Sequence, residues 1–452
     1  MNRDVCDGAV SVTTPEALVA WDNMLRAFLA HSAETPVHLG AVLKAEPDLG
    51  IALAAKGLFS IMMGRKELMA AAHDAHKAAL KAPKGSKREQ LWIKALTEWL
   101  EGRPSGAIAC MEKILLDNPR DTFSAKISHA IRFILGDAVG MRQSLERILP
   151  AHGPDHPMRG YLLGCYAFAL EETGDYAQAE HTGLEGLRHA TDDAWGLHAV
   201  THVYDMTAQP EQGIKFIEQN TNAWKHCNNF RYHVWWHKAL LHLDRGELDL
   251  CLELYDHKIR HEKTDDYRDI ANATSLLMRL ELEGVKVGKR WEELADYSEN
   301  RTQDGCLVFA DLHYMLALGA AGRFDAAGDL ASRFTIDAAR QGEMPKRVEK
   351  PGICALMGLH SFAEARWDTA FMNLARARPA MQTIGGSHAQ RDVFERMTID
   401  AGIRAGFYDQ THEILAQRMV QRGGTQDRFT ATRFEMLSQA NRIPAQKIGT
   451  AH

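Results

Sequence analysis

The fold is decided by a short phrase whose clearest copy reads Gly174-Asp175-Tyr176-Ala177-Gln178-Ala179. A turn residue, usually glycine, is followed after a few residues by a small residue at the start of the next helix. Further copies begin at Gly64, Gly102, Gly136, Ala208, Gly246, Gly288, Gly322, Ala365 and Gly406. The residues that close these phrases lie 34 to 43 positions apart. This spacing is typical of tetratricopeptide units, which are helix–turn–helix repeats of about 34 residues.

The segments between the phrases have helical composition and periodicity. Ala, Leu, Met, Glu and Arg are frequent, and alternating runs of β-branched residues do not occur. The sequence therefore predicts an all-α, tetratricopeptide-type right-handed α-solenoid of about ten degenerate helix–turn–helix repeats. We expect one continuous solenoid over residues 1–452. Its predicted parts are an N-terminal helical cap (1–49), repeats with a central groove (50–340), C-terminal repeats (351–440) and a frayed tail (441–452).

Composition excludes several classes of protein. A net charge of −6 over 452 residues argues against a nucleic-acid binder, which needs a concentrated basic face. No apolar run approaches the roughly 18 residues of a membrane span, and the first thirty residues do not resemble a signal peptide. We therefore expect a cytoplasmic protein with no membrane and no nucleic-acid partner.

The most informative side chains are two histidine pairs at helical spacing. Residues 195–205 read WGLHAVTHVYD and residues 232–237 read YHVWWH. The first helix of a tetratricopeptide unit lines the concave face, chiefly through its second, fifth, sixth, ninth and twelfth residues. Aromatic walls with a few convergent polar groups are typical of ligand pockets. The predicted ligand-binding residues are Tyr161, Phe168, Trp195, His198, His202, Asp205, His233, Trp236, His237 and His313.

Three functions are compatible with this groove. In the first, it binds a peptide, a protein or a small molecule. In the second, the protein is an enzyme, for example a metal-dependent hydrolase, with its catalytic residues among His198, His202, Asp205 and His237. In the third, the histidines are structural and the protein is an interaction scaffold. Whether the chain is an enzyme, and its oligomeric state, are left open.

A divalent metal ion is the cofactor that the histidine spacing suggests. His198 with His202, and His233 with His237, lie four positions apart and can chelate an ion across one helical turn. The HExxH motif is absent because residue 199 is alanine. The four histidines are therefore candidate metal ligands without a recognised catalytic motif.

The chain resembles the tetratricopeptide repeat protein 38 family from about Thr14 to about Arg422. The likeness is carried by Asp193-Ala194-Trp195 with His198, His202 and Met206; by Trp236-His237; by Gly284-Val285, Val287-Gly288 and Arg290-Trp291; and by Gly385-Gly386-Ser387 with residues 389–394 (AQRDVF). Asp205 departs from the family, in which glutamate is more usual at that position. The resemblance implies an all-helical repeat protein in a cytosolic setting, and it implies no established reaction.

Overall fold

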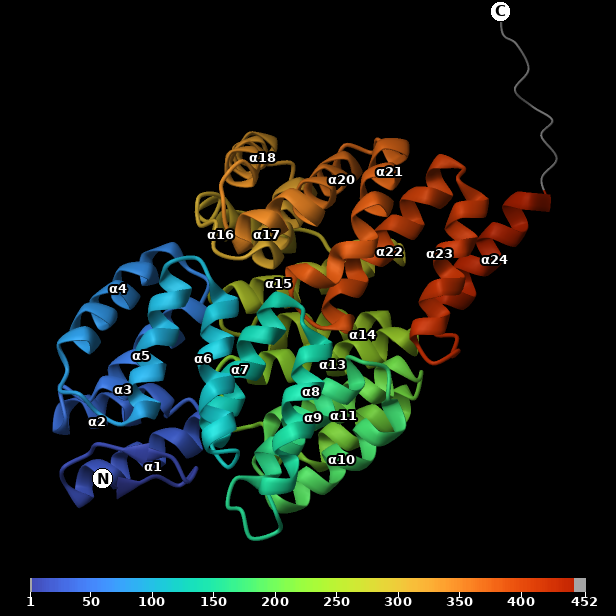
Figure 1. Ribbon diagram of the computed structural model, residues 1–452. Coiled ribbons are helices and arrows are strands. Elements are labelled where there is room, and N and C mark those ends of the chain that lie inside the picture. Colours follow the sequence, from blue (N-terminus) through green and yellow to red (C-terminus); the bar gives the residue numbers. More distant parts are fainter. Residues whose placement is uncertain (1, 443–452) are drawn as a thin grey trace, which may run out of the picture.

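The computed structural model describes residues 2–442 and is built almost entirely of helices (Figure 1). The one sheet within this range is a two-stranded antiparallel ribbon of β1 (Asn2–Arg3) and β2 (Ala9–Val10). None of the described helices combines the length and the apolar character that crossing a bilayer requires. The predicted all-α class is confirmed. Of the predicted tail, residues 443–452 lie outside the described residues.

Ten successive helix pairs form the repeats of the described chain. The first helices of the pairs are α3 (Gly50–Met62), α5 (Lys87–Leu100), α7 (Thr122–Leu135), α9 (Arg159–Glu171), α11 (Ala194–Met206), α13 (Phe230–Asp244), α15 (Tyr267–Leu282), α17 (Val308–Ala320), α20 (Ile353–Ala363) and α22 (His388–Ala405). The second helices are α4 (Lys66–Lys81), α6 (Pro104–Asp117), α8 (Ala138–Ile148), α10 (Tyr176–His189), α12 (Pro210–Gln219), α14 (Leu248–Leu254), α16 (Arg290–Glu299), α18 (Phe324–Ala338), α21 (Trp367–Ala377) and α23 (Tyr408–Gln421).

The remaining elements lie before, between and after these pairs. They are α1 (Pro15–Leu29), α2 (Thr35–Ala45), α19 (Glu343–Arg347), α24 (Arg428–Arg442) and the short helical segments η1 (Leu149–Ala151), η2 (Thr221–Ala223), η3 (Tyr255–Ile259), η4 (Val348–Gly352) and η5 (Arg378–Ile384). Helices α1 and α2 fall within the range predicted as a cap, and the first pair begins at Gly50.

The turn inside each pair explains the repeated phrase. Every residue that opens a phrase has a positive φ, from 51° at Ala208 to 82° at Gly174. Glycine adopts this conformation without the steric cost that a Cβ atom brings, which is why eight of the ten phrases open with it. The sequence phrase therefore marks a left-handed turn that reverses the chain between two packed helices.

Both ends of the chain pack back onto the middle of the solenoid. Near the N-terminus, the backbone N–H of Asn228 donates to the carbonyl of His31 (3.0 Å), beside an antiparallel bridge between Ser32 and Cys227. At the other end, α22 contacts α11 and α15, and the red C-terminal helices of Figure 1 lie beside the central ones. Arg433 on α24 forms an ion pair with Glu283 (2.7 Å), just after α15. Segments from both terminal regions of the described chain therefore lie against the central repeats.

Candidate metal centre

Four histidine side chains from two successive first helices meet in the interior. His198 and His202 lie on α11, and His233 and His237 lie on α13. The Nε2 atom of His198 lies 2.9 Å from Nε2 of His202 and 3.0 Å from Nε2 of His233. Nε2 of His233 in turn lies 3.1 Å from Nε2 of His237. The four side chains offer donor atoms that all lie within 4.8 Å of one another. All four residues are buried, with exposed fractions of 0–8%.

Hydrogen bonds alone do not satisfy this arrangement. Nδ1 of His233 lies 2.9 Å from Oδ1 of Asn272, which only accepts, so Nδ1 carries the hydrogen and Nε2 of a neutral ring presents a lone pair. Nε2 of His198 faces Nε2 of His202 and Nε2 of His233, but it can supply at most one hydrogen. A single cation at the centre would accept the lone pairs of all four rings.

Burial disfavours the charged form of three of these imidazoles, those of His198, His233 and His237. Burial lowers the pKa of His198 and of His237 well below the usual value, and the neighbouring imidazoles lower both further. Burial also lowers the pKa of His233 to about 3, although its hydrogen bond to Asn272 acts in the opposite direction. Neutral imidazole is the form that binds metal ions.

Aromatic rings surround the four histidines. Phe168 stacks on His198 with ring centroids 5.4 Å apart, Trp195 lies 5.0 Å from the same ring, and Trp236 stacks on His233 at 5.1 Å. These three aromatic residues are the predicted ones. An apolar shell of this kind limits solvent access and lowers the local dielectric constant, which strengthens metal–ligand interactions.

Two polar partners of the cluster were not predicted from the sequence. Asn272 on α15 orients His233, as described above. Glu171, the last residue of α9, is fully buried and places Oε2 3.4 Å from Nδ1 of His202. Burial raises the pKa of Glu171, but the interactions with His202 and His388 outweigh burial and lower it to about 2. The carboxylate is therefore ionised, and it can orient the His202 ring as carboxylates orient metal-ligating histidines.

Three predicted residues lie apart from the four histidines. Asp205 pairs with Arg422 of the C-terminal region (3.1 Å). His313 points Nδ1 at the carbonyl of Phe309 (2.7 Å), and the hydroxyl of Tyr161 donates to Asp192 (2.8 Å). All three residues lie on first helices, as the repeat pattern predicts, but their side chains interact with residues outside the four-histidine cluster.

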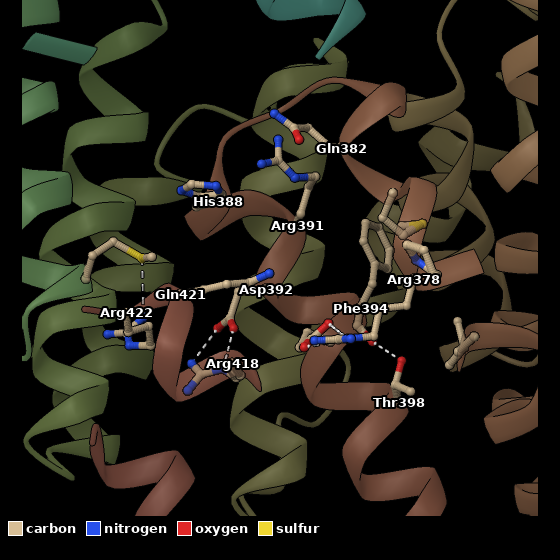
Figure 2. Close-up of a pocket in the computed structure, with 15 residues that line it drawn as sticks. Arg378, Gln382, His388, Arg391, Asp392, Phe394, Thr398, Arg418, Gln421 and Arg422 are labelled. Carbon is tan, nitrogen blue, oxygen red and sulfur yellow. Dashed lines mark hydrogen bonds and ion pairs between the residues drawn. The ribbon is translucent and has the colours of Figure 1, made fainter. Parts of the chain in front are cut away.

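A cavity of about 230 Å³ has His388 of α22 in its wall. Figure 2 shows its wall, in which His388 and Arg391 lie on one side and Asp392 and Arg418 form an ion pair on another (2.8 Å). His388 also approaches Glu171, with its Nδ1 3.6 Å from Oε1. Glu171 therefore lies between the four-histidine cluster and the cavity.

Comparison with known proteins finds only distant structural likeness. No family model matches the chain. A human IFIT1 dimer with PPP-AAAA is 13% identical, with 96% of each chain covered and a TM-score of 0.42. A monomeric IFIT1 mutant with Gppp-AAAA is 14% identical over 97% of this chain and 91% of that one, with a TM-score of 0.39. A Naa15/Naa10 structure bound to HypK-THB is 15% identical over 95% and 66%, with a TM-score of 0.25.

At these identities and TM-scores the likeness carries no conclusion about this chain. The predicted absence of a nucleic-acid partner stays a prediction. The resemblance to the tetratricopeptide repeat protein 38 family also stays a prediction.

Proposed function

We propose that this protein is a helical-repeat metalloprotein in which His198, His202, His233 and His237 bind one divalent transition-metal ion. The observation that carries this proposal is the grouping of four buried imidazoles, whose donor atoms all lie within 4.8 Å of one another. Four nitrogens at about 2.0–2.1 Å from a tetrahedral zinc ion lie about 3.3 Å apart. The observed contacts of 2.9–3.1 Å need only small ring movements to reach that geometry.

The ligand set favours zinc or another late first-row divalent ion. Imidazole suits zinc, copper, nickel and iron, whereas magnesium and calcium require oxygen ligands. Four protein ligands complete a tetrahedral shell, which is the form of structural zinc sites. We therefore assign the centre a structural role, holding α11 against α13 in the middle of the solenoid.

The metal explains this cluster better than an organic ligand does. A peptide or a small molecule needs accessible side chains, whereas these rings are at most 8% exposed and are enclosed by aromatic residues. Burying four imidazoles without partners would cost free energy for each unpaired polar atom. One bound cation offsets that cost at all four Nε2 atoms at once.

Elemental analysis of the purified full-length chain tests the proposal. We expect about one zinc ion per chain after equilibration with Zn²⁺, and its loss in a His202→Gln/His237→Gln variant. His313→Gln is the matched control, because His313 is equally buried but lies outside the cluster. A wild-type protein that retains no metal, or a double variant that binds zinc as the wild type does, would overturn the assignment.

A further inference from the structure

A second group of ligand atoms is formed by Glu171, Glu172 and His388, of which His388 lines the cavity. Glu171, Glu172 and His388 offer one donor atom each, all within 4.8 Å of one another. Nδ1 of His388 lies 3.6 Å from Oε1 of Glu171 and 3.8 Å from Oε1 of Glu172. Because these separations exceed an ordinary hydrogen bond, the three side chains form a cradle rather than a bonded network.

The buried carboxylate of Glu171 indicates that this cradle lacks an occupant. Glu171 has no exposed surface, and within residues 2–442 neither of its oxygens has a hydrogen-bond partner. Nδ1 of His388 is likewise enclosed without a hydrogen bond in the described chain. A carboxyl group in the interior needs a hydrogen-bond partner, an ion-pair partner or a metal ion. Its Oε2 faces His202, which leaves Oε1 for a ligand on the cavity side.

The surrounding structure holds the other two donors in place. His388 is the first residue of α22, and the capping box of Ser387 and Gln390 fixes that helix end. The backbone N–H of His388 donates to Oε1 of Glu172 (2.6 Å), and Arg391 donates to Oε2 of the same carboxylate (3.1 Å). The cradle is therefore built from the end of α9 and the start of α22, which are far apart in sequence.

We propose that Glu171, Glu172 and His388 form a second metal site, which binds a divalent ion of the manganese or iron type and opens onto the cavity. Two carboxylates and one imidazole are harder ligands than four imidazoles, and they suit such ions. Three protein ligands leave coordination positions free, as in catalytic rather than structural metal sites. The side chain of His388 is 29% exposed and lines the cavity (Figure 2), so the free positions face that space.

The two sites share Glu171, which faces His202 of one and His388 of the other, but their remaining residues differ, so the two can be tested separately. The full-length chain is stripped of metal with a chelator, loaded with one equivalent of Zn²⁺, and titrated with Mn²⁺ while free Mn²⁺ is followed by electron paramagnetic resonance. We expect one bound Mn²⁺ per wild-type chain. Glu172→Gln and His388→Gln should each weaken Mn²⁺ binding by at least about tenfold, since loss of an outer-sphere partner alone costs about 10–100-fold.

Glu395→Gln is the matched control. Glu395 lines the same cavity but pairs with Arg378 (2.8 Å), so its variant should bind Mn²⁺ as the wild type does. His388 is partly exposed, and its variant decides the result if Glu172→Gln does not fold. A wild type that binds no Mn²⁺, or variants that bind it with unchanged affinity, would overturn the second site and indicate that a protonated His388 simply pairs with Glu171. Mn²⁺ binding that persists without zinc and is lost in Glu172→Gln would support the second site even if the four-histidine centre fails its own test.

Discussion

The hydrogen bond between His233 and Asn272 gives the sharpest test of the four-histidine centre. Nδ1 of His233 lies 2.9 Å from Oδ1 of Asn272, and Asn272 is only 1% exposed. Replacing Asn272 with leucine keeps a side chain of similar size and removes the only acceptor that fixes the tautomer of His233. The ring can then place its hydrogen on Nε2, which blocks metal binding, or keep it on Nδ1 without a partner.

The size of the effect follows from the role of this hydrogen bond. Loss of an outer-sphere partner lowers metal affinity by about 10–100-fold, which corresponds to about 1.4–2.8 kcal/mol. In excess zinc the free energy of unfolding should fall by the same amount, because a ligand that binds the folded state stabilises it in proportion to the logarithm of its affinity. In the metal-free protein, the substitution should lower the free energy of unfolding by about 1–3 kcal/mol if the Nδ1–H group of His233 stays buried and unpaired.

Competition between the protein and a chromogenic zinc chelator measures the affinity directly. Ser275→Ala is the matched control, because Ser275 lies on the same helix and accepts a hydrogen bond from the indole of Trp236 (3.2 Å), not from a histidine. That variant should lose some stability and keep its zinc affinity. If Asn272→Leu and Ser275→Ala bind zinc within about twofold of the wild type, Asn272 does not orient a metal ligand and the reasoning fails.

Three further predictions concern the scaffold. Burial raises the pKa of Asp427, but Arg418 and Arg422 hold it well below its usual range. This stabilisation is therefore present above about pH 4, where unfolded-state carboxylates ionise, and is lost as the pH falls. Asp427→Asn should cost about 3–5 kcal/mol near neutral pH and flatten the dependence of unfolding free energy on acid pH; an unchanged slope would contradict the assignment. Gly136→Ala should destabilise more than Gly102→Ala in urea unfolding, because both have positive φ but a Cβ at Gly136 would lie 1.8 Å from the carbonyl oxygen of Gln382, whereas Gly102 faces open space. Equal losses would mean that η5 moves freely. Arg433→Met should also cost about 3–5 kcal/mol, because it leaves Glu283 and Asp400 without a buried partner, and a thermal melt unchanged from the wild type would contradict this.

The sequence was sufficient to predict the helical repeats and the convergence of the histidines. Both depend on local information, namely turn residues that favour positive φ and side chains four positions apart on one helix face. Counting nineteen positions back from Ala179 starts a unit at Gly160, and its twelfth residue is Glu171. The spacing of the repeats therefore places Glu171 on the concave face of its unit.

Asn272 and His388 could not be placed in the same way. The phrase that closes at Glu293 starts a nineteen-residue unit at 274, whereas α15 begins at Tyr267 because the turn after it is longer than in other repeats. The same count from Thr411 starts a unit at 392, after the observed start of α22 at His388. The cause differs between the two helices: the turn after α15 is long, whereas α22 is itself a long helix of 18 residues. Either change shifts the register, and each residue of error rotates a side chain by about 100°.

The packing of both terminal regions onto the central repeats restricts the gain and loss of repeats in this protein. In an open solenoid each repeat contacts only its neighbours, so units can be gained or lost at small cost and unfolding can begin at either end. Here His31 is hydrogen-bonded beside the start of α13, and Arg422 is paired with the end of α11. An inserted or deleted repeat would pull at least one of these contacts apart. These two long-range contacts therefore restrict the number of repeats, and the chain should gain or lose its structure as a single cooperative unit.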